Sequence, residues 1–178
     1  VEGVGRVACG VLGQLILETG EAALIANELL ANPTLEDLSA ACAAAIYLEK
    51  ELAYQPAVDF LVRVAELAEE PFADTGELGN CFFWLASAFS TTGQYDQELE
   101  YYQKSLAIAL KQLGPDHPHV ATSYNNIGVV YDNKAEYDKA LEYYQKDLAI
   151  SLKQLGPDHP DVAISYHNIG LVYKKKAE

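Results

Sequence analysis

Hydrophobic residues between positions 113 and 154 recur at intervals of three and four, which is the spacing along one face of an α-helix. A β-strand would need an interval of two, so the pattern argues against a strand here. Gly114 and Pro115 interrupt the pattern, because glycine readily adopts the left-handed conformation that closes a helix and proline cannot continue one. Asp116 is a candidate N-cap, and Pro118 fits the first turn of the next helix.

The helix that begins near Pro118 is predicted to extend to about Lys134. A tight turn before Tyr137 then leads into an antiparallel partner helix that reaches about Gln154. This part of the chain therefore reads as a pair of helices, and the predicted fold class is all-α, without strands.

The helix pair belongs to an internal repeat with a period of 42 residues. When residues 99–136 are set against residues 141–178, 30 of the 38 aligned pairs are identical. An earlier copy, residues 93–112, aligns with residues 135–154 at the same offset. A fixed period of this length is the signature of a stacked repeat array, in which each unit packs against its neighbours.

The first 78 residues follow the repeat less closely. Residues 41–70 align with it at an offset of 41, which places Ala57 at a small packing position and Leu61 at a large one. Residues 10–33 are predicted to form another helix pair, with Gly20 in the turn. Whether this pair is a diverged repeat or an unrelated helical cap is left open by the sequence.

Charge is distributed unevenly along the chain. The net charge is −14, and residues 1–100 hold 17 acidic and 3 basic residues, whereas residues 101–178 hold nine of each. Binding to nucleic acid or to an anionic membrane requires lysine and arginine to neutralise phosphates, so neither partner is expected.

Three cysteines, Cys9, Cys42 and Cys81, lie far apart in hydrophobic helical segments. Their number and spacing match neither a zinc site nor a disulfide framework, so we expect small buried side chains in a reducing compartment such as the cytoplasm. The chain has no methionine, even at position 1, which suggests a fragment or a processed chain. The hydrophobic run at residues 7–17 is too short to span a membrane.

The segment SYNNIGVVYDNKAEYDKALEYYQKDLAI (residues 123–150) closely resembles a tetratricopeptide repeat. The resemblance rests on the spacing of Tyr124, Ile127, Gly128, Tyr131, Tyr137, Ala140, Leu141 and Tyr144. The 42-residue period and the linker LGPDHPDVA (residues 155–163) resemble the kinesin light chain type. This resemblance implies a right-handed superhelical solenoid of antiparallel helix pairs.

The resemblance also implies a division of the chain into units. Residues 1–78 would be degenerate helical pairs forming a cap, residues 79–112 unit 1, residues 113–154 unit 2, and residues 155–178 the first helix of a truncated unit 3. Four residues depart from the family pattern: Ala135 replaces the usual glycine, Glu98 a small alanine, and Ser105 and Asp147 residues that are commonly alanine. Glu98 makes the packing of unit 1 doubtful, because burying an unpaired carboxylate is unfavourable.

Eight aligned pairs differ between the two most similar copies, and five of them lie in the first helix of the unit. At about 100° per residue these five span an arc of only about 100°. Stacking requires one fixed set of packing residues, so the face that differs is predicted to be the face that does not pack.

In the resembled family the corresponding stripe lines the concave groove that binds extended peptides. Matched residue by residue, the groove positions here form three sets, with Asn126 and Asn168 at the edge, where similar asparagines bind a peptide backbone. We call all of them the variable stripe: Asn80, Phe83, Ser87, Ser90 and Thr91; Thr122, Asn125, Asn126, Val129, Asp132 and Asn133; Ile164, His167, Asn168, Leu171, Lys174 and Lys175.

Two interpretations of this stripe remain open. It is either a peptide-binding surface or a solvated surface that varies freely; the apolar residues Phe83, Val129, Ile164 and Leu171 favour binding. Likewise, the cluster Lys174–Lys176 either attracts an acidic or C-terminal carboxylate peptide or is a solvated helix end favoured by the helix dipole. The pattern lacks the lysine and asparagine arrangement of carboxylate-clamp co-chaperones, so chaperone-tail binding is not expected.

The linker histidines invite a metal or acid–base interpretation. Asp116, His117 and His119 lie in one linker, and Asp158, His159 and Asp161 in the next. Each set combines a capping aspartate with a helix-starting proline, so caps and turns are the preferred interpretation. No nucleophile elbow or glycine-rich phosphate loop is present, and neither a cofactor, a metal nor an enzymatic activity is expected.

The sequence therefore supports two functional hypotheses. The first is a protein–protein interaction scaffold that binds a short peptide segment of a partner in its concave groove. The second is a regulatory or sensor arm of a larger multidomain enzyme or signalling ATPase. In addition, the helix at residues 160–177 has no partner helix after it, so we expect self-association through its Tyr166, Ile169 and Tyr173 side.

Overall fold

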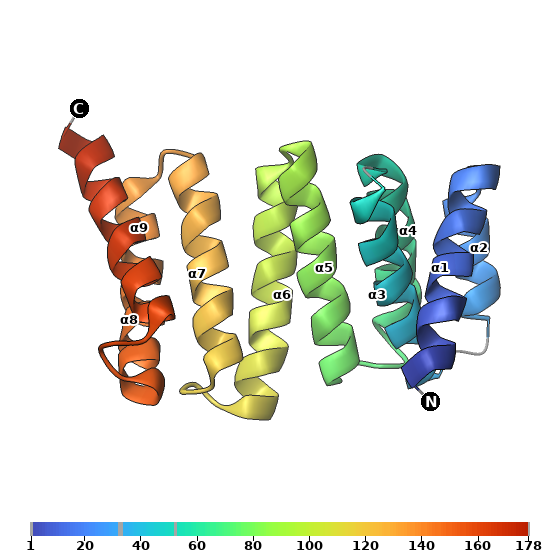
Figure 1. The fold of residues 1–178 in the computed structure, drawn as a ribbon, viewed down its shortest axis with the longest axis horizontal. Helices are drawn as coiled ribbons and strands as arrows, with labels where there is room; N and C mark the ends of the chain where they lie inside the picture. Colours follow the sequence, from blue (N-terminus) through green and yellow to red (C-terminus); the bar gives the residue numbers. More distant parts are fainter. Residues whose placement is uncertain (1, 32–33, 52, 178) are drawn as a thin grey trace. The chain divides into compact units, whose positions relative to one another are not determined.

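The structure, a computed structural model, describes the backbone of residues 2–31, 34–51 and 53–177, and the side chains from residue 11 onward except at residue 49. Within these residues the chain forms nine α-helices and no strand (Figure 1). The predicted all-α helical repeat fold is confirmed. The helices are α1 (Glu2–Thr19), α2 (Ala22–Leu29), α3 (Leu35–Lys50), α4 (Tyr54–Ala68), α5 (Gly76–Thr92), α6 (Tyr95–Leu113), α7 (Pro118–Asn133), α8 (Tyr137–Leu155) and α9 (Pro160–Ala177).

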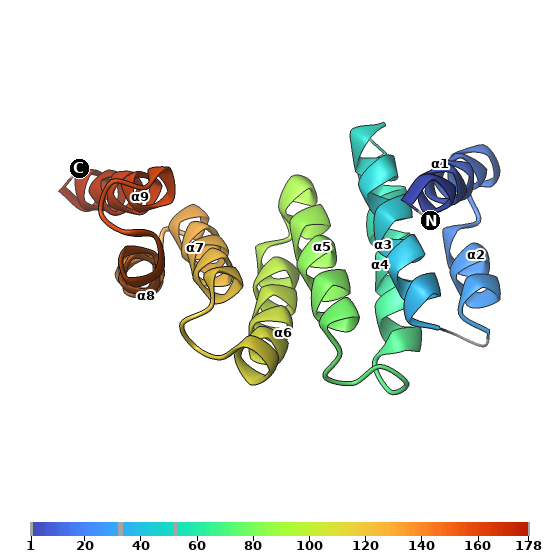
Figure 2. The same cartoon turned by 60° about the horizontal axis from the view of Figure 1, so that its bottom comes forward.

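The chain divides into two compact units, which differ from the repeat units numbered 1 to 3. The first unit is Val1–Tyr101 and the second unit is Tyr102–Glu178, and the division falls inside α6. In the first unit α1 packs on α3, α2 on α4, and both α3 and α4 on α5 (Figures 1 and 2). Ala57 and Leu61, the expected small and large packing residues of α4, are both fully buried. None of the helices in the described part of the chain is long and apolar enough to cross a membrane.

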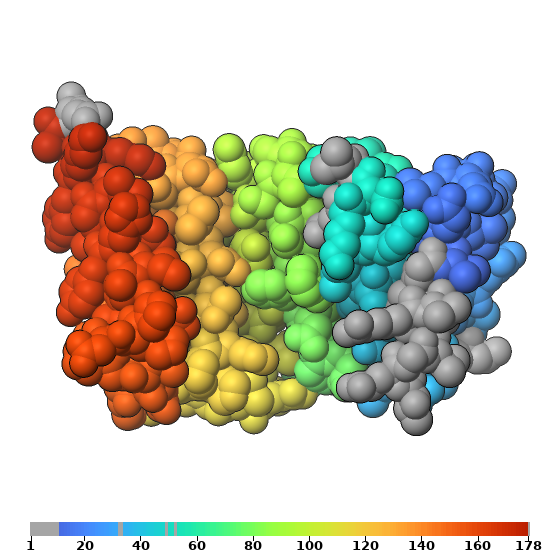
Figure 3. Space-filling model, viewed as in Figure 1, coloured from blue at the N-terminus to red at the C-terminus, as the bar shows by residue number. Residues whose placement is uncertain are grey.

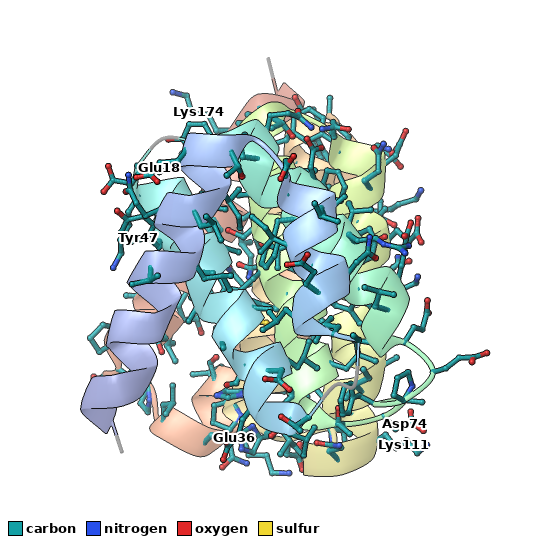
Figure 4. All side chains as sticks on the ribbon, turned by 90° about the vertical axis from the view of Figure 1, so that its right-hand side faces the viewer. Glu18, Glu36, Tyr47, Asp74, Lys111 and Lys174 are labelled. Carbon is teal, nitrogen blue, oxygen red and sulfur yellow. The ribbon has the colours of Figure 1, made fainter. Side chains whose placement is uncertain are left out.

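The contact between α1 and α3 depends on Gly13, because a Cβ atom there would lie 2.4 Å from the Tyr47 ring. The Tyr47 hydroxyl donates a hydrogen bond to Gln14 across the same contact, at 3.2 Å. Figure 4 shows the Tyr47 side chain beside α1, on the same side as Glu18. An α-helix tolerates an interior glycine when a neighbouring ring needs the space.

Two of the three cysteines meet inside the first unit. Cys42 of α3 and Cys81 of α5 are both buried free thiols, as expected, although they are 39 positions apart in the sequence. A hydrogen bond with Cys42, together with burial, raises the pKa of the Cys81 thiol well above its usual value. A raised pKa makes this thiol a weak nucleophile. The Cys9 side chain lies outside the described residues.

Glu98, the acidic residue expected to disturb the packing, is buried on α6 with 2% of its surface exposed. Its Oε2 atom has no hydrogen-bond partner. Burial raises the pKa of this carboxyl, and a hydrogen bond with Ser90 partly offsets the shift. The residue therefore occupies the small-residue position of the repeat at an energetic cost.

In the second unit α7 and α9 both pack on α8 (Figures 1 and 2). Ile127 of α7 is fully buried, and the Tyr131 ring stacks on that of Tyr143 with centroids 5.4 Å apart. Gly128 faces Tyr144, and a Cβ atom at Gly128 would lie 2.7 Å from that ring. The residues that recur in each copy are thus the residues that pack.

The turn between α7 and α8 contains Ala135, whose φ of 57° lies in the left-handed region. Gly93, its counterpart 42 residues earlier, has a φ of 73°. Alanine is strained in this conformation, because its Cβ approaches a carbonyl oxygen, whereas glycine is not. The departure from the family pattern therefore corresponds to real backbone strain.

The N-cap of α7 is His117, so the expectation that Asp116 would cap this helix was wrong. The His117 Nδ1 atom accepts a hydrogen bond from the backbone N–H of His119 at 3.2 Å, with Pro118 in the first turn. The Asp116 carboxylate instead pairs with Lys153 at the end of α8, at 2.5 Å. An ion pair with a residue distant in sequence thus replaces the local capping bond.

Candidate functional site

The variable stripe lies on three helices of the structure. Its first set, on α5, belongs to the first unit: Asn80 is exposed, and Phe83 and Ser87 are half-buried. Its second and third sets lie on α7 and α9 of the second unit, where the two helices meet through their side chains. The site below is therefore the part of the stripe on α7 and α9.

Two side-chain pairs join α7 to α9 along the stripe. The Asn168 amide donates a hydrogen bond to the Asn125 carbonyl at 3.0 Å. Near the other end, Lys175 forms an ion pair with Asp132 at 2.7 Å. Both partners in each pair are predicted site residues, so the face that was expected not to pack does hold some contacts between neighbouring helices.

The lysine cluster at the end of α9 is partly neutralised within the second unit. Lys175 pairs with Asp132, and Lys176 forms an ion pair with Asp138 of α8. The Oδ1 atom of Asp132 is buried without a hydrogen-bond partner. These lysines therefore present less free positive charge than the sequence suggests.

The apolar members of the stripe are accessible. Ile164 and Leu171 of α9 are 53% and 41% exposed, and Val129 of α7 is half-buried. Figure 3 shows the α9 side chains, in red, at the surface along the helix. His167 is also exposed, whereas Asn168 is half-buried against α7. Apolar side chains are thus presented between polar ones along this helix.

A pocket of about 200 Å³ lies between α7, α8 and α9. It includes Thr122, Asn125 and Ile164, so it coincides with one end of the variable stripe. Each of the three helices contributes to its walls: Pro118, Ala121, Thr122 and Asn125 from α7; Asp147, Ile150, Ser151, Gln154 and Leu155 from α8; Asp161 and Ile164 from α9.

Asp147 is the most buried polar group of the pocket that carries a formal charge, with 5% of its surface exposed. Its Oδ2 atom accepts a hydrogen bond from Ser165 at 2.6 Å, and its Oδ1 atom accepts one from Ser151 at 3.1 Å. Burial raises the pKa of the carboxyl, the two serine hydrogen bonds lower it, and the charge of Asp161 adds to the rise. The two hydroxyl donors favour the ionised form but only partly offset the effect of burial, so the pKa of Asp147 lies above its usual value.

Sequence reasoning did not place Asp147, Ser151 or Asp161 in the site. All three belong to the eight aligned pairs that differ between the two most similar copies, with Ser105, Ala109 and His119 as their counterparts. Asp147 and Ser151 lie on the second helix of the unit, and Asp161 lies in the first turn of α9, outside the variable stripe that the helical wheel identified. The list of differences itself was the signal that could have identified them.

The linker histidines act as caps. His159 accepts a hydrogen bond from the Asp161 backbone at 3.2 Å, as His117 does from His119. The part of the chain that the structure describes contains no group of three or more histidine, cysteine or acidic side chains placed to hold a metal ion. The geometry thus favours the capping interpretation of both linkers.

Solved structures share this arrangement of helices. A kinesin light chain candidate from Podosopora anserina with nearly identical TPR-like repeats is 19% identical, with a TM-score of 0.72 over 95% of this chain and 85% of that one. BtubC (BKLC) from P. vanneervenii is 21% identical, with a TM-score of 0.70 over 93% of this chain. This chain spans 66% of BtubC, slightly less than two thirds. The apo form of RapI is 19% identical, with a TM-score of 0.71 over 97% of this chain and 64% of RapI. At such identities the likeness shows the fold alone.

The sequence comparison is more specific. No curated protein matches the sequence. The tetratricopeptide repeat profile, however, matches residues 80–153 and 133–178, which together make up more than half of the chain. Repeats of this kind are generally protein–protein interaction modules and typically non-enzymatic scaffolds. The chain therefore belongs to the tetratricopeptide repeat family, and its fold is similar to that of the kinesin light chain candidate.

Proposed function

We propose that this chain is a non-catalytic interaction module that binds a short extended peptide of a partner protein along the variable stripe of α7 and α9. The observation that carries the proposal is the pocket of about 200 Å³ between α7, α8 and α9, because it lies on that stripe. A peptide-binding groove needs such a depression to receive a side chain, together with polar groups that fix the backbone.

The Asn125 and Asn168 pair is suited to bind a peptide backbone. The hydrogen bond between them uses one carbonyl and one N–H. Within the described residues these two side chains make no other hydrogen bond. The Asn125 NH₂ group and the Asn168 carbonyl can therefore bond to a ligand. An extended peptide presents a carbonyl and an N–H at each residue, which are the complementary groups.

Apolar contacts would supply most of the affinity. Ile164 and Leu171 are large and exposed, whereas the Lys175 ammonium is already paired with Asp132 inside the chain. Micromolar affinity, about −8 kcal/mol, is ordinary for one such peptide.

We also infer that residues 79–112 and 113–154 are successive repeat units, that residues 155–178 are the first helix of a third, and that residues 1–78 form a diverged helical cap. The helix ends support this division, since α5 with α6, α7 with α8, and α9 follow these boundaries closely. Truncation at residue 112 tests it: a chain of residues 1–112 that keeps its helix content by circular dichroism would support the boundary.

The test of the proposed function starts with a displayed library of short random peptides selected on the whole chain. The tightest binder is then titrated by calorimetry against the wild-type chain and the variants N125A, N126A and N168A. Each variant should weaken binding by about three- to thirtyfold, the loss of about one hydrogen bond, and should keep the wild-type circular dichroism spectrum.

A matched control is Q145A, because Gln145 is exposed on α8 and does not line the pocket. This variant should bind as the wild type does. Unchanged affinity in all three asparagine variants would refute the assignment of the groove.

A further inference from the structure

Three of the eight sequence differences lie outside the variable stripe, and all three meet in the pocket. Asp147 and Ser151 of α8 and Asp161 of α9 all line it. In the preceding copy the corresponding residues are Ser105, Ala109 and His119. Between the two copies, the buried acid and the serine that donates to its Oδ1 atom are therefore both replaced.

We propose that this pocket binds the cationic end of a lysine or arginine side chain of the partner peptide, with the Asp147 carboxylate as the principal acceptor. The proposal rests on the proposed function, and it specifies what kind of residue the bound peptide carries at this position. It makes the second copy of the repeat selective for a basic side chain.

The charge of the pocket supports this occupant. Two carboxylates, those of Asp147 and Asp161, line it, whereas no lysine or arginine does. Asp147 forms no ion pair within the described residues. The Asp161 carboxylate lies 3.7 Å from His159, an interaction that is ionic only when the histidine is protonated. An ammonium or guanidinium group would compensate the negative charge that the chain itself leaves uncompensated.

The hydrogen bonds of Asp147 leave room for another donor. A carboxylate has about four acceptor sites, and Asp147 receives hydroxyl groups from Ser151 and Ser165 only. The Ser165 hydroxyl is in addition 3.0 Å from the Asp161 backbone carbonyl, so its single proton is shared between two acceptors. A charged N–H donor would form a stronger hydrogen bond with this carboxylate than either serine does.

The walls of the pocket fit the hydrocarbon part of a basic side chain. Ile150, Leu155 and Ile164 are aliphatic and would contact the methylene groups, as lysine and arginine stems commonly do on apolar surfaces. The volume of about 200 Å³ exceeds the roughly 30 Å³ share of one water molecule severalfold, so it accommodates the end of a side chain.

The experiment compares oriented peptide libraries that share random flanking positions and differ in one fixed central residue: lysine, arginine, acetyl-lysine, norleucine or glutamate. Binding to the immobilised whole chain is measured for each library. On the wild-type chain the lysine or arginine library should bind about tenfold more tightly than the norleucine and acetyl-lysine libraries, because a hydrogen bond to a charged group is stronger than a neutral one.

The decisive variant is the double substitution D147S/S151A, which gives the pocket the residues of the preceding copy at these two positions. These residues are already compatible with the repeat, and the preference for a cation should fall to within about twofold. A second variant, D161N, alters an exposed residue of the pocket and should reduce the preference about threefold. The matched control, D158N, changes an exposed acid that does not line the pocket and should leave the preference unchanged.

A wild-type chain that binds the norleucine library as tightly as the lysine and arginine libraries would overturn the proposal. So would a folded D147S/S151A variant that keeps the full preference; if this variant does not fold, an unchanged preference in D161N has the same consequence. In these cases peptide binding itself persists, so the proposed function stands. Absence of binding by every library would contradict both proposals.

Discussion

Helices α7 and α9 have nearly the same sequence but different surroundings. On α7, Ile127 is fully buried and Tyr131 is 8% exposed, because α8 covers this face. On α9, the counterpart Tyr173 is 55% exposed and Ile169 is half-buried. The glycines differ in the same way, since a Cβ at Gly128 would contact Tyr144, whereas Gly170 has open space around it.

The difference shows that one packing sequence has two structural roles. A repeat keeps the residues it needs for stacking wherever it lies in the array, whether or not a neighbour covers them. The same substitution made on α7 and on α9 therefore measures how much a covering helix contributes to stability, because the two local sequences are almost identical.

The largest contrast is expected for the buried isoleucine. I127A should lower the free energy of unfolding by about 2–5 kcal/mol, because it leaves a cavity at a fully buried position of α7. I169A should lower it by less than about 1.5 kcal/mol, since its half-exposed side chain buries less surface. Urea denaturation followed by circular dichroism measures both, and equal losses would contradict the difference in coverage.

The glycine pair should give effects of opposite sign. G128A should destabilise the chain by about 1–3 kcal/mol, because the new methyl group would lie 2.7 Å from the buried Tyr144 ring. G170A should stabilise it by up to about 1 kcal/mol, because alanine is the better helix former and nothing obstructs it. The same denaturation experiment applies, and stabilisation by G128A would show that the ring moves aside freely.

The turn before α8 offers a third comparison, between equivalent turn positions of two repeat copies. A135G should stabilise the chain by about 1 kcal/mol, because glycine removes the strain of a φ of 57°. The reverse change, G93A at a φ of 73°, should destabilise it by about 1–2 kcal/mol. Thermal unfolding of the two variants gives the measurement, and a loss of stability in A135G would contradict the strain.

The smallest effect concerns association through the exposed side of α9. Tyr166 and Tyr173 are each 55% exposed, so weak self-association is expected at high concentration. Light scattering should show an apparent mass that rises with concentration in the wild type and stays constant in Y166S/Y173S. A strictly monomeric wild type would refute this expectation.

The sequence predicted those features that depend on local pattern and repetition. The helices and the buried Ile127 follow from the periodicity of apolar residues. The N-cap of α7 was mispredicted because Asp116 pairs with Lys153, which is 37 residues away. A capping rule considers only neighbouring residues, so it does not include this contact.

The candidate site could be predicted only in part. The stripe on α7 and α9 came from a helical wheel, which treats each helix alone. The Asn125–Asn168 hydrogen bond and the Lys175–Asp132 ion pair join two helices and were therefore not foreseen. The pocket combines α7, α8 and α9, so its acid Asp147 became recognisable only when the three helices were placed together.

The central claim is that the variable stripe on α7 and α9 contacts a ligand, whereas the apolar residues retained between copies are packing residues. It is tested most directly by titrating an isotope-labelled chain with the selected peptide and following amide and methyl chemical shifts. The largest changes should occur at Asn125, Val129, His167 and Leu171, and at Ile164 beside the pocket. Changes confined to the Tyr166 and Tyr173 side of α9 or to Gln145 on α8 would contradict the claim.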